Sequence, residues 1–358
     1  MTRIELSVAA FLLGAYALFL TAMFAVMWIR ASGRRRRAVT TQSQTPQIRD
    51  ALVDYLSGSN DQTRIKEFVR TNRSEVADAI LDFHGTVGGS ARDRLCDLAL
   101  EFSLVHDWCE QAHSKDQVVR RKAYVRLSFV CAYEPCRRVA GDLLLLALED
   151  ADPEVRMAAA RALVQSGTIE ELGQVFRLAV AQSLLIRLLL AEDLRRHATE
   201  LCASAIPVVL NGGNARQTLA ALQILVAWER ALPLPDVLHK LLESHDHEIR
   251  VEALRLAPLV PITEESRSAL LRLLREGDEE ENTIAALAAG RLRLQEALPY
   301  LARCLRTGTA ELARIAAAAL AEMPPKGWQT LQQIAGGADN SALIAAAALE
   351  RGRRRAGV

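Results

Sequence analysis

The chain is poor in residue types that whole classes of proteins require. It has 6 cysteines in 358 residues, too few for a scaffold held together by disulfide bonds. Its 44 basic and 43 acidic residues leave a net charge of +1, which argues against a general nucleic-acid binder. Aromatic residues make up only 5%. With 50% apolar and 24% charged residues, the composition excludes both a disordered chain and a protein with many membrane spans.

The sequence also lacks the short motifs of common catalytic and cofactor sites. It contains no phosphate-binding G-x-x-x-x-G-K loop, no G-x-S-x-G nucleophile turn and no H-E-x-x-H zinc motif. A glycine cluster in residues 84–90 (HGTVGGS) joins predicted helices and is interpreted as a connecting loop. No C-x-x-C pair is present, so we expect the six thiols to be reduced and packed between helices. The sequence therefore predicts no enzyme, no cofactor and no metal site.

Two histidine clusters have a structural and a functional interpretation. His245 and His247 flank Asp246 and would suit a metal, but residues two apart at a helix start do not share a face. We therefore favour a loop around a capping Asp246. A second cluster, His106, Cys109 and His113, is interpreted as part of a surface or half-buried helix.

A glutamate cluster and three tryptophans also have a structural and a functional interpretation. Glu279, Glu280 and Glu281 begin a predicted helix and are interpreted as exposed charges that complement its dipole. Trp108, Trp228 and Trp328 would each serve as a binding hot spot on an exposed helix. Partial burial in the core is the favoured interpretation of these tryptophans.

Residues 6–29 form a run of 24 without a charged side chain. As a helix of about 1.5 Å per residue, the run would reach about 36 Å, enough to cross a hydrocarbon core of about 30 Å. Arg3 and Glu5 before it cancel, whereas Arg30 and the cluster Arg34, Arg35, Arg36 and Arg37 follow it. The positive-inside rule therefore predicts an uncleaved single-pass anchor with the N-terminus outside and the rest in the cytoplasm. A cleaved signal peptide and a buried soluble helix are the alternatives.

The segment after the predicted anchor is basic and polar. Its arginine cluster would set the topology and would also attract anionic lipid headgroups, at about 1 kcal/mol per basic residue. Residues 38–48 have the composition of a linker. The sequence thus predicts a short outer terminus (1–5), a transmembrane helix (6–29), a basic juxtamembrane linker (30–48) and a helical repeat region (49–358).

Residues 152–163 (DPEVRMAAARAL) carry the clearest helix motif. Asp152 suits an N-cap, Pro153 the first helical position and Glu154 the positive end of the helix dipole. Apolar residues then recur three to four positions apart, the spacing of one helix face. Just before this motif, residues 142–150 (DLLLLALED) predict a second, short apolar helix.

The same unit returns along the chain. The predicted second helices open at Asp116, Asp152, Ser183, Asn214, Asp246, Asp278, Thr309 and Asp339. These starts lie 30 to 36 residues apart, with apolar stretches between them. A period of this length is typical of stacked helix pairs. Residues 50–83 are predicted to be helical as well.

The Asp-x-x-Val-Arg segments and the small residues after them resemble HEAT repeats, of the short bacterial kind described as HEAT-like or phycobilisome-lyase-like. The resemblance covers residues 90–352 and is strongest at Asp116, Asp152 and Asp246. It implies an all-α fold, a right-handed α-solenoid of about eight helix pairs after one transmembrane helix. Such repeats commonly use Asp and Arg to join neighbouring turns. The resemblance therefore implies a structural ladder of Asp116, Arg120, Asp152, Arg156, Arg187, Asp246 and Arg250, with unconnected surface charges as the alternative.

Charge is distributed unevenly along the chain. Residues 34–37 and 351–355 contribute +4 each and residues 1–30 contribute +1, which leaves −8 for the rest. A mildly acidic array would not follow a phosphate backbone, so we expect no nucleic-acid partner. The arginines of residues 351–355 are interpreted as a polar cap on the last helix.

These features predict a protein-binding scaffold at the bacterial inner membrane, with its solenoid in the cytoplasm. Solenoids offer long binding surfaces, commonly lined by the second helix of each pair. A membrane-associated partner, such as a transporter or a polysaccharide-synthesising glycosyltransferase, would gain most from the anchor. The alternatives are a lyase-type enzyme acting on a bound cofactor or protein, for which we find no matching catalytic residues, and a self-assembling scaffold.

Overall fold

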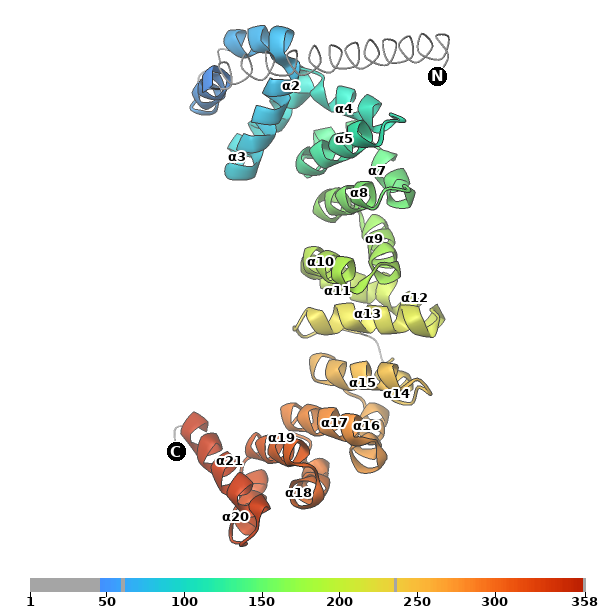
Figure 1. Cartoon of the computed structure of the whole chain (residues 1–358), viewed down its shortest axis with the longest axis vertical. Coiled ribbons are helices and arrows are strands. Elements are labelled where there is room, and N and C mark those ends of the chain that lie inside the picture. Colours follow the sequence, from blue (N-terminus) through green and yellow to red (C-terminus); the bar gives the residue numbers. More distant parts are fainter. Residues whose placement is uncertain (1–45, 59–61, 235–236, 357–358) are drawn as a thin grey trace, which may run out of the picture. The chain divides into compact units, whose positions relative to one another are not determined.

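The computed structural model describes residues 46–58, 62–234 and 237–356 (Figure 1). Within these ranges every regular element is a helix, and no strand occurs. The prediction of an all-α fold is therefore confirmed for the described part of the chain. The chain divides into two compact units, with the boundary between Gly141 and Asp142.

The predicted anchor is not part of this description. Residues 6–29 and the cluster Arg34, Arg35, Arg36 and Arg37 lie outside the described residues. Among the residues that are described, no helix is both long enough and apolar enough to cross a bilayer.

The described residues of the first unit form six helices around a small core. A helix over residues 46–56 is followed by α2 (Thr63–Thr86), α3 (Ser90–Glu101), α4 (Leu104–Ala112), α5 (Gln117–Val130) and α6 (Glu134–Ala140). Helix α4 packs against α5 and α6, and α2 packs against α3 and α5. The loop predicted at residues 84–90 is shorter than expected, because α2 continues to Thr86 and α3 starts at Ser90.

A charged side chain enters the core of the first unit. Arg126 of α5 donates from Nη2 to Oδ1 of Asp78 on α2 at 2.6 Å. Its guanidinium also lies 6.0 Å from the ring centroid of Trp108, which is 1% exposed. The Arg126 side chain is 8% exposed, whereas that of Asp78 is 50% exposed. The pair therefore connects the interior with the surface, which lowers the cost of burying the cation.

Helix pairs repeat along the second unit. The first helices of the pairs are α7 (Leu143–Leu146) with η1 (Ala147–Glu149), α9 (Ile169–Ala181), α12 (Ala205–Gly212), α14 (Leu238–Leu242), α16 (Glu264–Glu276), α18 (Leu298–Thr307) and α20 (Lys326–Ala335). The second helices are α8 (Pro153–Ser166), α10 (Leu184–Leu194), α13 (Ala215–Ala227), α15 (His247–Leu256), α17 (Glu279–Arg291), α19 (Ala310–Ala321) and α21 (Asn340–Ala356). Short helices η2 (Arg195–His197), α11 (Ala198–Ala203), η3 (Ala257–Leu259) and η4 (Gln295–Ala297) lie between them.

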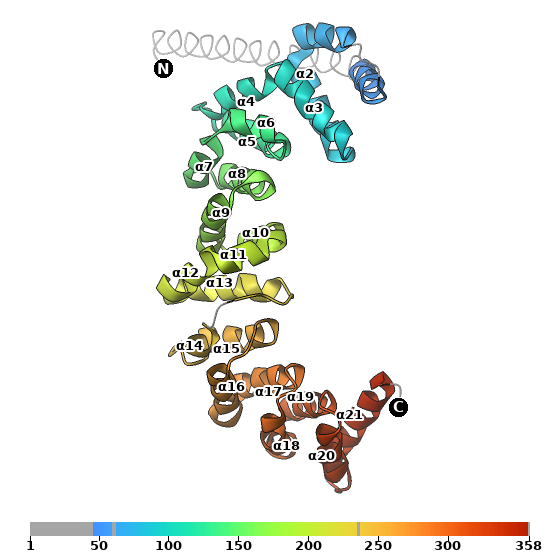
Figure 2. The ribbon, with the colours of Figure 1, turned by 180° about the vertical axis from the view of Figure 1, so that it is seen from behind.

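The second helices of this unit form one layer. Each packs against the second helix of the next pair, from α8 through α10, α13, α15, α17 and α19 to α21 (Figures 1 and 2). The first helices pack along one side of this layer, as Figure 2 shows for α14, α16 and α18. This repeated packing of helix pairs is that of an α-solenoid.

The helix starts confirm the period that the sequence predicts. All eight predicted positions lie directly before a second helix, from Asp116 before α5 to Asp339 before α21. At six of them the side chain accepts a hydrogen bond from a backbone N–H of the first helical turn: Asp116, Asp152, Asn214, Asp246, Asp278 and Thr309. Asp339 does the same toward the N–H of Ala342 at 3.1 Å. Such caps satisfy N–H groups that have no partner within the helix.

Small residues allow the second helices to approach closely. A Cβ atom at Gly290 of α17 would lie 2.7 Å from both Cα and Cβ of Ala319 on α19. Larger residues fill the spaces near the ends of helices. Trp228 follows α13, is fully buried and donates from Nε1 to the carbonyl of Ala191 on α10 at 2.6 Å.

Candidate functional site

The acidic residues expected in the repeat ladder lie at helix N-termini. Asp116, Asp152 and Asp246 accept hydrogen bonds from the backbone N–H two residues further on, at 2.8, 2.9 and 2.9 Å. The expected capping role of Asp246 between His245 and His247 is confirmed. These carboxylates therefore help to start helices α5, α8 and α15.

The arginines of the same ladder reach back over the loop before their helix. Each donates a guanidinium hydrogen bond to a backbone carbonyl five or six residues earlier. The pairs are Arg120 with Ser114 (3.1 Å), Arg156 with Asp150 (2.6 Å), Arg187 with Gln182 (2.9 Å) and Arg250 with Ser244 (2.8 Å). These bonds satisfy carbonyl groups at the junction of the two helices of one pair.

Two of these arginines also reach the second helix of the next pair. Arg187 donates to Oε1 of Gln223 on α13, and Nε of Arg250 donates to Oε1 of Glu281 on α17 at 2.6 Å. The Glu281 side chain is only 5% exposed, so its interpretation as an exposed charge is wrong. The cause is its position between Arg250 and the first turn of α17, where it also accepts from the N–H of Asp278. A ladder along all repeats stays a prediction.

His247, Asp278 and Glu281 bring ligand-type atoms within 4.8 Å of one another. Both oxygens of Glu281 already accept hydrogen bonds, one from Arg250 and one from the N–H of Asp278. Backbone hydrogen bonding, chiefly from the N–H of Glu281, lowers the pKa of Asp278, and His247 lies 2.8 Å from its Oδ2. The group is therefore explained by the capping box of α17 and by the ion pair between Arg250 and Glu281.

Three hollows lie on the second-helix layer of the second unit and are linked by shared arginines. The acidic hollow, of about 320 Å³, is lined by Leu219, Gln223, His247, Glu248, Val251, Glu252, Arg255 and Glu280. The apolar hollow, of about 480 Å³, is lined by Val226, Glu229, Leu254, Arg255, Pro258, Leu259, Ile284, Leu287, Ala288 and Arg291. The arginine pocket, of about 450 Å³, is lined by Arg291, Arg293, Ala318, Ala321, Glu322, Pro324, Trp328, Ala348, Arg351, Gly352 and Arg355. Arg255 lines the first two and Arg291 the last two, so the hollows follow one another.

The acidic hollow carries more negative than positive charge. Arg255 lies 2.6 Å from Glu252 and 3.5 Å from Glu280, so one guanidinium faces two glutamates and a third, Glu248, lines the same hollow. Glu248 forms no ion pair with any described residue and is exposed. The hollow therefore favours a cationic group.

The apolar hollow presents leucine and isoleucine side chains at the surface. Leu287 is 41% exposed, and Ile284 on the same helix is half-buried. Leu254 of α15 is fully buried beneath them. An apolar side chain of a ligand would find apolar contacts here without any rearrangement of the helices.

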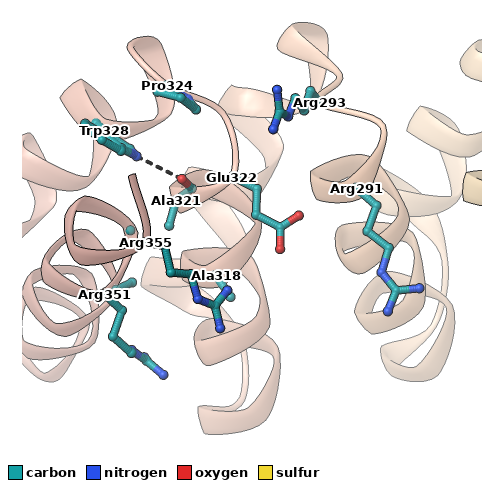
Figure 3. A pocket seen from close by; sticks show the side chains of 11 residues that line it. Arg291, Arg293, Ala318, Ala321, Glu322, Pro324, Trp328, Arg351 and Arg355 are labelled. Atoms are coloured by element: carbon teal, nitrogen blue, oxygen red, sulfur yellow. Dashed lines mark hydrogen bonds between the residues drawn. The ribbon is translucent and has the colours of Figure 1, made fainter. Parts of the chain in front are cut away.

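The arginine pocket lies at the C-terminal ends of three second helices (Figure 3). Arg291 and Arg293 come from the end of α17, and Arg351 and Arg355 come from α21 on the other side. Glu322, directly after α19, lies between these two groups in Figure 3. The wall of the pocket thus contains four arginines and one glutamate.

The sequence alone predicts only part of the lining of the arginine pocket. The sequence predicts a polar cap at residues 351–355, and two of these exposed arginines, Arg351 and Arg355, also line the pocket. Arg291 and Arg293 were not predicted, because their meeting with α21 depends on the packing of α17, α19 and α21. Trp108 and Trp228 are buried in the core, as favoured, whereas the half-buried Trp328 forms a wall of the pocket.

No family model matches this chain, and no curated protein sequence matches it. Among solved structures, the chain is similar to an engineered protein from a structural genomics programme, with 20% identity over 87% of this chain and 96% of that chain and a TM-score of 0.37. It is also similar to the Escherichia coli protein YibA, with 13% identity over 71% of this chain and 97% of that chain and a TM-score of 0.40. Neither similarity supports the assignment of a family or an activity.

Proposed function

We propose that this chain is a membrane-anchored, HEAT-like scaffold that binds a protein partner on the second-helix layer of its second unit. The observation that supports this proposal is the juxtaposition of the acidic hollow and the apolar hollow, which share Arg255. Exposed leucine beside a surplus of carboxylates is a surface suited to a ligand that is both apolar and basic.

The chemistry of the two hollows specifies the partner segment. An apolar side chain seated against Ile284 and Leu287 would remove apolar surface from water, worth about 25 cal/mol for each Å². A lysine or arginine next to it in the partner would reach Glu248 and Glu252. We therefore infer a segment in which basic residues flank an apolar anchor.

The remaining parts of the proposal come from the sequence. A right-handed solenoid of about eight HEAT-like pairs, an anchor over residues 6–29 and the basic cluster Arg34, Arg35, Arg36 and Arg37 on anionic lipid would hold the repeats at the inner face of the membrane. This placement favours a membrane-associated partner, such as a transporter or a glycosyltransferase complex. A reporter fused after Val358 that is active only in the periplasm would contradict the orientation.

Photo-crosslinking from the apolar hollow tests the docking proposal. A photoreactive residue replaces Leu287 in the full chain, and crosslinks are formed in intact cells and identified by mass spectrometry. We expect one defined product whose crosslinked peptide contains an apolar residue next to lysine or arginine. The same photoreactive residue at Lys240, exposed on α14 in the first-helix layer, should not give this product.

Charge reversal supplies the matched control for this experiment. Glu248→Lys combined with Glu280→Lys should abolish the product by repelling the basic segment. Glu265→Lys on α16 makes the same type of change outside the hollows and should leave the product intact. Equal yields in all variants, or crosslinks only to a second copy of this chain, would overturn the proposal, and the second result would favour self-assembly.

A lyase-type enzyme remains the alternative from the sequence, and no observation favours it. The acidic hollow, which is lined by three glutamates, has no phenylalanine, tyrosine or tryptophan in its wall. A scaffold needs neither an aromatic clamp nor a proton donor there. We therefore propose no catalytic role for this chain.

A further inference from the structure

The arginine pocket contains more positive charge than its protein neighbours balance. No described residue accepts a hydrogen bond from, or forms an ion pair with, the guanidinium groups of Arg291, Arg293 or Arg355. Arg351 donates only from Nε, to the carbonyl of Ala347 on its own helix at 3.2 Å. Glu322 lines the pocket and forms no ion pair with any residue in the described part of the chain. Arg272, by contrast, pairs with Glu243 at 3.0 Å.

One of these arginines is held in a backbone conformation that arginine rarely adopts. Arg293 has φ 53°, the left-handed region that normally favours glycine at the end of a helix. Its N–H donates to the carbonyl of Gly290 at 3.0 Å and so helps to close α17. A glycine would make the same turn at lower cost, so the turn itself does not require an arginine.

The aromatic wall of the pocket is fixed in place. Trp328 donates from Nε1 to the carbonyl of Ala321 at 2.8 Å, drawn as a dashed line in Figure 3. Gly352 of α21 makes room for this bond, because a Cβ there would lie 3.4 Å from Nε1 and 3.3 Å from Cβ of Ala321. The indole ring therefore offers a rigid apolar surface beside the arginines.

We propose that the arginine pocket binds a small ligand through a diphosphate group. Guanidinium groups present fixed pairs of N–H donors that match phosphate oxygens. A single phosphate monoester, with a charge of about −1.5 to −2, would leave a pocket of four arginines and one glutamate positively charged. Two linked phosphates balance this charge more closely, and the hollow of about 450 Å³ is large enough to hold them. This inference is independent of the docking proposal, because Arg293 and Arg355 line neither of the other two hollows.

Calorimetric titration of the purified full chain with inorganic pyrophosphate tests the proposal. We expect saturable binding of one pyrophosphate, and weaker binding of orthophosphate and of citrate, which carries carboxylates instead. Arg355→Gln should weaken pyrophosphate binding by at least about tenfold, because each arginine contributes charge-assisted hydrogen bonds. Arg353→Gln is the matched control: it removes the same charge from the same helix outside the pocket and should change the affinity less than about twofold.

A substitution at Arg293 separates binding from folding. Arg293→Gly relieves the left-handed backbone, so its Tm should equal or exceed that of the wild type while pyrophosphate affinity falls at least about tenfold. No saturable binding of pyrophosphate, or equal weakening in Arg353→Gln and Arg355→Gln, would overturn the proposal.

Two further titrations identify the source of the diphosphate. Tighter binding of a nucleoside diphosphate than of pyrophosphate would indicate a soluble nucleotide stacked on Trp328. Tighter binding to vesicles that contain a diphosphate lipid, again lost in Arg355→Gln, would indicate a lipid headgroup. Either result supports the diphosphate site, whereas vesicle binding that persists in Arg355→Gln would exclude a lipid source at this pocket.

Discussion

Arg126 and Glu281 are charged side chains that enter the packed interior and have an oppositely charged partner there. Arg126 lies between Asp78 and the face of Trp108, and Glu281 accepts hydrogen bonds from Arg250 and from a backbone N–H. Removing one partner leaves the other charge buried without compensation. Exposed pairs differ, because water replaces a lost partner at little cost.

Asp78 therefore contributes more to stability than an aspartate of an exposed pair on the same helix. Asp78→Asn should lower the free energy of unfolding by about 1–3 kcal/mol, because the buried guanidinium of Arg126 loses its counter-charge. Asp82 pairs with Arg49, and these side chains are 63% and 52% exposed, so Asp82→Asn should cost less than about 0.5 kcal/mol. Urea unfolding followed by circular dichroism measures the free energy of unfolding of both variants. Equal losses in Asp78→Asn and Asp82→Asn would contradict this prediction.

Helix starts were predictable from the sequence, whereas the meeting of side chains across helices was not. A capping residue acts within one turn, so Asp116, Asp152 and Asp278 could be placed from local sequence. The burial of Glu281 depends on Arg250 in the preceding pair, and local sequence contains no signal for it. The arginine pocket depends in the same way on helices that are far apart in the chain.

Small residues between the second helices determine how closely neighbouring helices pack. Gly290→Ala would raise the intrinsic helix propensity of α17. The added Cβ would nevertheless lie 2.7 Å from Cα and Cβ of Ala319, so α17 and α19 must separate. We expect a loss of about 1–3 kcal/mol in the free energy of unfolding.

Gly212 is the control for this substitution, because it also lies in a helix. A Cβ there meets nothing within 4 Å. Gly212→Ala should therefore stabilise the chain by about 0.4–1 kcal/mol through helix propensity and the entropy of the unfolded chain. Thermal unfolding of both variants shows whether each substitution raises or lowers the Tm. A higher Tm for Gly290→Ala would show that α17 and α19 are not closely packed.

For the molecule as a whole, each second helix depends mainly on its neighbours in the layer. Helix α13 packs against α10 and α15, and α17 packs against α15 and α19. In such an array stability is approximately a sum of terms for each repeat and for each interface between neighbours. A local defect should therefore loosen nearby helices before distant ones.

Hydrogen exchange in a Trp228→Ala variant tests this dependence on neighbours. The substitution removes a fully buried indole and its hydrogen bond to Ala191, at a cost of about 3–5 kcal/mol. Amide protection should fall most in α10, α13 and α15, less in α19 and α21, and not in α2 to α5 of the first unit. Trp328→Ala is the matched control, because this half-buried ring lies at the end of the array and contacts Ala321. Its effect should be confined to α19, α20 and α21, whereas an equal loss of protection in every helix would mean that the repeats unfold together.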